Sequence, residues 1–63
     1  MNEEFLRLLL KQNNEYLCEV CRYLNDRYFV AFIDENQKEM QECKDIYMAI
    51  DKELRLRGYW PNK

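Results

Sequence analysis

The sequence of 63 residues contains no histidine, only one glycine and only one proline. A single glycine excludes the glycine-rich loops that bind phosphate groups, and so few turn-forming residues argue against a sandwich or barrel of many strands. The absence of histidine does not forbid acid–base catalysis. However, no nucleophile–base pair stands out, and a chain this short lacks the walls of a deep pocket. We therefore expect a non-enzymatic protein that uses no cofactor.

The chain also lacks a long hydrophobic run and a large net charge. The apolar residues near its N-terminus form a short run that Arg7 interrupts, which is neither a signal peptide nor a transmembrane segment. The net charge of −2 provides no overall positive field that would attract nucleic acid or an anionic membrane. We expect a soluble cytoplasmic protein that does not contact membranes.

Three cysteines are present, an odd number that cannot pair completely within one chain, so we expect reduced thiols. Cys18 and Cys21 form a C-x-x-C pair. A structural zinc site needs four ligands, usually cysteine and histidine, and this pair lies inside an expected helix rather than in a turn. On that helix Cys18 points away from the apolar side and Cys21 lies at its edge. We interpret both as helical side chains without a metal or redox role, and Cys43 as a core residue. The alternative is a metal site in which a carboxylate completes the three thiolates or two chains each supply the pair.

Residues 3–25 show the periodicity of an amphipathic helix. At about 100° per residue, one apolar arc contains Phe5, Leu6, Leu9, Tyr16, Leu17, Val20, Tyr23 and Leu24. Asn13 falls within this arc. Because the apolar faces on the two sides of residue 13 stay in phase, we expect one long helix, in which Asn13 is a polar notch at an interface. In the alternative, the helix breaks here and Asn13 or Asn14 caps a second helix.

A second amphipathic helix is expected at residues 35–57. Asp34 is placed as its N-cap, with Gln37 three residues later in a capping-box arrangement. Acidic residues prevail at its start and basic residues at its end, which suits the helix dipole. Gly58 follows directly as a C-terminal glycine, with Pro61 just beyond. The apolar positions, spaced by three and four residues, are Met40, Cys43, Tyr47, Ile50 and Leu54.

Between the two helices lies the segment RYFVAFI, residues 27–33, which is rich in β-branched and aromatic residues. Its local preference is for a strand, which would need the same strand from a second subunit as a partner. On a helix, its apolar residues face nearly all directions, which implies burial on most sides. Periodicity alone does not separate these structures. We favour a helical segment and retain the strand shared between subunits as the alternative.

We expect residues 1–63 to form a single all-α domain, a helical hairpin or a small three-helix arrangement. A domain of this size buries only about 60% of the surface of its unfolded chain, so it usually needs disulfides, a metal or a second subunit. Two hairpins can pack together as a four-helix bundle, and we therefore predict a symmetric homodimer. The predicted dimer core contains Leu9, Asn13, Tyr16, Val20, Met40, Cys43, Tyr47, Ile50 and Leu54.

Aromatic residues are abundant, with one tryptophan, five tyrosines and three phenylalanines. Tyrosine and tryptophan are enriched at the hot spots of protein interfaces. The aromatic residues that the core absorbs least easily lie in residues 27–33 and in the tail, residues 58–63. They are Tyr28, Phe29, Phe32, Tyr59 and Trp60. We predict that these residues bind a partner protein, with the alternative that the tail aromatics fold back over the end of the hairpin.

These features favour a small protein–protein interaction module, a regulator or inhibitor of the kind carried by phages and mobile elements, which binds a larger protein. The alternative is a nucleic-acid-binding regulator. In that hypothesis Arg55, Arg57 and Lys63 contact phosphates while Tyr59 and Trp60 stack on bases. The acidic first half of the same helix opposes this alternative, because phosphates repel it.

Overall fold

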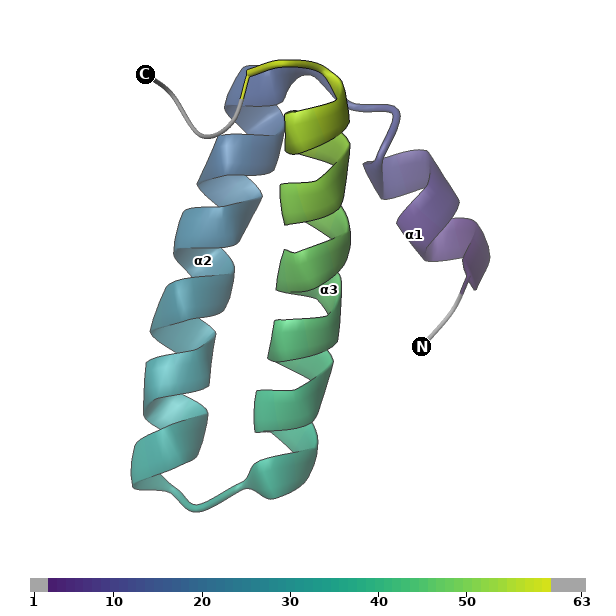
Figure 1. Ribbon diagram of the computed structural model, residues 1–63. Helices are drawn as coiled ribbons and strands as arrows, with labels where there is room; N and C mark the ends of the chain where they lie inside the picture. Colours follow the sequence, from purple (N-terminus) through teal and green to yellow (C-terminus); the bar gives the residue numbers. More distant parts are fainter. Residues whose placement is uncertain (1–2, 60–63) are drawn as a thin grey trace.

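The computed structural model describes residues 3–59, which form three α-helices joined by short turns. The helices are α1 (Glu3–Leu9), α2 (Asn14–Ile33) and α3 (Gln37–Leu56). α2 and α3 run antiparallel and side by side as a hairpin, and α1 lies beside α3 near the end of the hairpin where α2 begins (Figure 1). No strand occurs among residues 3–59, so the predicted all-α hairpin is confirmed.

The chain turns between α1 and α2, so the expectation of one continuous helix over residues 3–25 is wrong. Asn13 is the N-cap of α2, and its Oδ1 accepts a hydrogen bond from the backbone N–H of Tyr16 at 2.8 Å. An asparagine in this position satisfies a donor that the first turn of a helix leaves unpaired. The alternative prediction, a second helix capped by Asn13, is confirmed. Because Asn13 is exposed, it is not a polar notch inside an apolar seam.

Residues 27–33 are the last turns of α2, so they form neither a strand nor a separate segment. The strand preference of β-branched and aromatic residues depends on pairing with another strand, and the chain offers none among residues 3–59. Ala31 is completely buried, but most of its neighbours in this segment are exposed. The expectation of burial on most sides is therefore wrong for these turns.

The helix caps on the two sides of the turn between α2 and α3 are different residues from those expected. Asp34 is the C-cap of α2, with its N–H donating to the carbonyl oxygen of Val30 at 3.0 Å, and Glu35 adopts a left-handed φ of 58°. Asn36 is the N-cap of α3, and its Oδ1 accepts from the backbone N–H of Glu39 at 3.1 Å. The expected N-cap at Asp34 is wrong, because the chain needs residues 34–36 to reverse its direction.

The end of α3 follows the prediction that Gly58 terminates the helix. Gly58 has a φ of 77°, a left-handed conformation that glycine adopts without steric strain. Its N–H donates to the carbonyl oxygen of Arg55 at 3.0 Å, and the N–H of Tyr59 donates to that of Leu54 at 3.1 Å. This pair of bonds is the Schellman arrangement, which satisfies carbonyl groups at the end of a helix.

The hydrophobic core lies between α2 and α3, from the start of α2 to its middle, and Leu9 of α1 joins it. Its completely buried large side chains are Leu17, Ile50 and Leu54. The whole cluster of buried residues comprises Leu9, Leu17, Cys21, Leu24, Cys43, Ile50 and Leu54. Four residues that were predicted for a dimer core, Leu9, Cys43, Ile50 and Leu54, are thus buried within a single chain.

Candidate functional site

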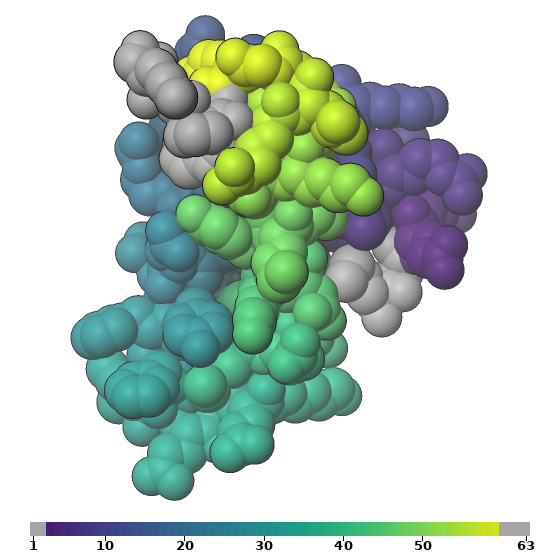
Figure 2. All heavy atoms as spheres, in the orientation of Figure 1, coloured from purple at the N-terminus to yellow at the C-terminus, as the bar shows by residue number. Residues whose placement is uncertain are grey.

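The C-terminal turns of α2 carry a cluster of exposed apolar side chains. Between residues 28 and 33 only Ala31 is buried, and the other five residues are 39–63% exposed. These five residues, called the distal patch, are Tyr28, Phe29, Val30, Phe32 and Ile33. In Figure 2 the blue-green side chains of this region stand out at the turn end of the hairpin. Single exposed apolar residues are common, whereas a contiguous cluster marks an interaction surface.

Helix geometry explains why the distal patch remains open. At about 100° per residue, Phe32, Phe29, Ile33 and Val30 follow one another around the outer side of α2. A single neighbouring helix can hide only the side on which Ala31 lies. α1 lies beside the other end of the hairpin and does not reach these turns (Figure 1). Within residues 3–59, no third element therefore covers the distal patch.

A groove runs along one face of the hairpin between α2 and α3. It consists of two adjoining hollows of about 280 and 180 Å³, which share Tyr28 and Lys44 as lining residues. The surface is called the groove face, and its lining residues are Leu24, Asn25, Tyr28, Gln37, Met40, Gln41, Cys43, Lys44 and Tyr47. Among residues 3–59, Lys44 is the only charged residue of this lining. Apart from Lys44, the groove face therefore combines apolar side chains with uncharged polar side chains.

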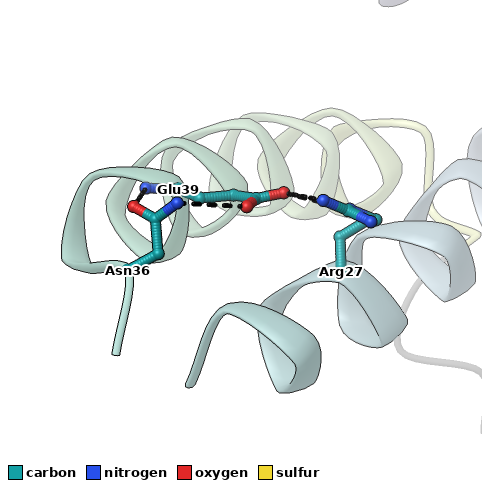
Figure 3. A network of polar contacts seen from close by, with 3 residues as sticks. All are labelled: Arg27, Asn36 and Glu39. Atoms are coloured by element: carbon teal, nitrogen blue, oxygen red, sulfur yellow. Dashed lines mark hydrogen bonds and ion pairs between the residues drawn. The ribbon is translucent and has the colours of Figure 1, made fainter. Parts of the chain in front are cut away.

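Acidic residues surround the turn end of the hairpin. Residues 34 to 45 comprise five acidic and two basic residues, so this end carries a negative charge. One of the acids, Glu39, pairs with Arg27 of α2, whose Nε donates to Glu39 Oε2 at 3.0 Å (Figure 3). This hydrogen bond raises the pKa of Arg27 above its usual value. The ion pair ties α2 to α3 close to the distal patch.

The structure brings together three of the five aromatic residues that were predicted at a partner interface. Tyr28, Phe29 and Phe32 all lie on the distal patch. Val30 and Ile33 were not placed at the interface by sequence reasoning. Their exposure could have been predicted from the sequence. The apolar residues of this segment face nearly all directions on a helix, and a single neighbouring helix covers only one side.

The tail aromatics do not join this cluster. Tyr59 lies at the other end of the hairpin, where a hydrogen bond to Cys18 raises the pKa of its phenol. Tyr59 is 41% exposed, so it packs only partly against the start of α2. For Tyr59, this position agrees with the alternative in which the tail aromatics fold back over the end of the hairpin. Trp60, the other predicted tail residue, lies outside the described residues.

Members of the predicted dimer core that lie outside the monomer core occupy mixed positions. Val20 and Tyr47 are partly buried against the core, and Met40 is half-buried where it lines the groove face. Tyr16 is 50% exposed on the first turn of α2. Of these four residues, Met40 and Tyr47 line the groove face.

The cysteine side chains lie closer to the core than their helical projection indicated. Cys21 is buried rather than at an edge, and Cys18 packs half-buried against the core instead of pointing away from it. Cys43 is buried, as predicted. Burial raises the pKa of the Cys21 thiol, with further contributions from Cys18 and Asp51, and burial likewise raises that of Cys43. Among residues 3–59, no three His, Cys, Asp or Glu side chains are grouped to hold a metal ion.

Comparison of the chain with protein-family models, with curated proteins and with solved structures found no match. Within residues 3–59, no helix combines the length and the apolar character needed to cross a membrane. The distal patch and the groove face are thus the features on which a functional proposal rests.

Proposed function

We propose that the protein is a small, non-enzymatic protein–protein interaction module, a regulator or inhibitor that binds a larger protein through the distal patch. The observation that supports this proposal is the exposure of Phe29, Phe32 and Ile33, each of which exceeds 60%. Removing apolar surface from water contributes roughly 25 cal/mol for each Å². Large apolar side chains that one chain leaves exposed in a cluster are therefore suited to act as binding anchors.

The spacing of the anchors favours a particular mode of binding. Phe29, Phe32 and Ile33 are separated by three and four residues, so they project from adjacent turns of one helix. Such a helix binds by placing its apolar residues into a groove of the partner. The neighbouring Asp34 and Glu35 favour a partner groove that lysine or arginine side chains flank, because opposite charges speed association and select the partner.

Nucleic-acid binding through the C-terminal segment has less support. Arg57 donates hydrogen bonds to the turn between α1 and α2, and Arg55 pairs with Asp51 at 2.9 Å. Guanidinium groups that are engaged within the chain are less free to contact phosphates. Lys63 and Trp60, which the alternative also requires, lie outside the described residues.

Quantitative affinity capture from extracts of the native host tests the proposed function. The baits are the tagged full-length chain, a patch variant with Phe29→Ser and Ile33→Ser, and a control with Glu19→Gln and Arg22→Gln. The control changes exposed residues on the outer side of the same helix, nearer to its start. We expect the patch variant to capture at least about tenfold less of the partner that the other two baits retain.

Circular dichroism and thermal unfolding serve as folding controls for these baits. Because all four substituted residues are exposed, helix content should be preserved in both variants. Equal capture of the same proteins by the wild type and the patch variant would contradict a binding role for the distal patch.

A further inference from the structure

Large apolar side chains along the groove are left partly uncovered. Tyr28 is 39% exposed, and Met40 and Tyr47 are only half-buried. The groove face therefore offers apolar surface that a second molecule can remove from water.

The half of the hairpin nearest its turn, residues 25–44, consists of a single layer of helices. The Cα positions extend over 34 × 29 × 15 Å, and α1 adds to the packing only at the other end (Figure 1). Domains generally bury their apolar side chains between two layers of secondary structure. Residues 25–44 lack the second layer that α1 supplies elsewhere.

The groove face has the chemistry that a surface needs to pair with its own copy. In a two-fold dimer the same patch faces itself, so a surface with clustered like charges would repel its copy. Within the described part of the chain, the groove lining has one charged residue, Lys44. Its other polar groups are amides, which both donate and accept hydrogen bonds and can pair with one another. These amides belong to Asn25, Gln37 and Gln41.

The residues predicted for a dimer core differ in whether a second copy can contact them. Leu9, Ile50 and Leu54 are already buried inside one chain, so they are not free to form a boundary between subunits. Met40 and Tyr47 are only half-buried and line the groove face. Met40 and Tyr47 are thus the half-buried members of the predicted dimer core that lie along the groove.

We propose that two copies of the chain pair through their groove faces as antiparallel hairpins, forming a four-helix bundle around Tyr28, Met40 and Tyr47. The antiparallel arrangement keeps the acidic turns of the two copies, residues 34–36, apart. The anchors Phe29 and Ile33 lie with Val30 on the outer side of the distal patch and stay free for the larger protein. Phe32 lies about 40° around α2 from Tyr28, at the boundary between the groove and this outer side. This pairing goes beyond the proposed function and does not depend on it.

Sedimentation velocity of the purified full-length chain over a range of micromolar concentrations tests the pairing. We expect the wild type to sediment as a dimer, with twice the 7.9 kDa mass of one chain. Asn25→Arg adds a cation at an exposed groove position near Lys44. Tyr28→Glu removes an aromatic ring from the proposed bundle core and puts there a carboxylate that loses its hydration on burial. Either variant should raise the dissociation constant of the dimer at least about tenfold. The matched control, Phe29→Glu, lies on the outer side and should remain a dimer.

Three outcomes would overturn the pairing, provided that circular dichroism shows folded helices. The first is a wild-type monomer at every concentration, with a melting temperature independent of concentration. The second is a dimer that Phe29→Glu disrupts and Asn25→Arg preserves, because the interface would then lie on the outer side. The third is a monomer that captures a host protein through its groove residues. Loss of host-protein capture in Phe29→Glu, with the dimer intact, supports the separation of the two surfaces.

Discussion

Arg57 donates a hydrogen bond from Nη2 to the carbonyl oxygen of Leu10, 47 positions earlier in the chain, at a distance of 2.6 Å. Its Nη1 donates to the carbonyl oxygen of Gln12 and to Oδ1 of Asn14, both at 2.8 Å. Its Nε donates to Glu53 Oε2 at 2.9 Å. One guanidinium group therefore fastens the turn between α1 and α2 to the end of α3.

We expect Arg57→Gln to lower the free energy of unfolding by about 1–2 kcal/mol, because several charge-assisted hydrogen bonds are lost together. Urea unfolding followed by circular dichroism measures this change. The matched control is Arg55→Gln, which removes a pair with Asp51 from a side chain that is 58% exposed. Exposed pairs of this kind contribute little, so the control should cost less than about 0.5 kcal/mol. Equal losses in the two variants would contradict the fastening role of Arg57.

We expect Asn13→Ala to destabilise the protein by about 1 kcal/mol, because the backbone N–H of Tyr16 loses its capping acceptor. Asn13→Leu should also destabilise it, whereas Asn13→Asp and Asn13→Ser retain a capping oxygen and should differ little from the wild type. Thermal unfolding ranks the four variants. A higher melting temperature for Asn13→Leu would restore the interpretation of Asn13 as a polar notch in an apolar seam.

We expect stability to fall with rising pH in the alkaline range. Burial raises the pKa of Cys21 and Cys43, so the native chain retains these thiol protons at pH values where the unfolded chain has lost them. Their contribution to stability is complete below the pKa of an unfolded thiol and is lost as the pH rises through the folded-state pKa. Urea unfolding across this window should show a smaller fall for the double variant Cys21→Ala and Cys43→Ala. An unchanged pH dependence in that variant would exclude the thiols as its cause.

We expect the protein to leave a heparin column at or near the starting salt concentration. The guanidinium groups of Arg55 and Arg57 are engaged within the chain, and the first half of α3 is acidic. Binding to nucleic acid weakens steeply with salt when many phosphates are contacted. Salt-sensitive retention that Arg55→Gln abolishes would instead favour the nucleic-acid alternative.

Much of the hairpin could be predicted because its signals are local or periodic. The spacing of Cys43, Ile50 and Leu54 places them on one side of α3, and all three are buried. Gly58 ends this helix because glycine adopts the left-handed conformation without strain. The strand alternative for residues 27–33 failed because a strand preference has no effect without a strand to pair with.

The candidate site could be predicted in part. We predicted Tyr28, Phe29 and Phe32 because their segment is apolar on all sides. One packing contact cannot bury so much apolar surface. Tyr59 was grouped with them on composition alone. Its position at the other end of the hairpin depends on the bonds that reverse the chain after α3 and on its contact with Cys18.

By itself, the sequence determined the helical class, the seam of α3 and the glycine that ends it, because each depends on periodicity or on the conformation of single residues. Only the tertiary structure decided that the chain breaks at Asn13 and that the distal patch stays uncovered. A cap and a continued helix differ locally by only about 1 kcal/mol, so contacts between distant residues select between them. Arg57 supplies such contacts at the break. After the break, α1 packs beside one end of the hairpin, so the distal patch at the other end stays uncovered.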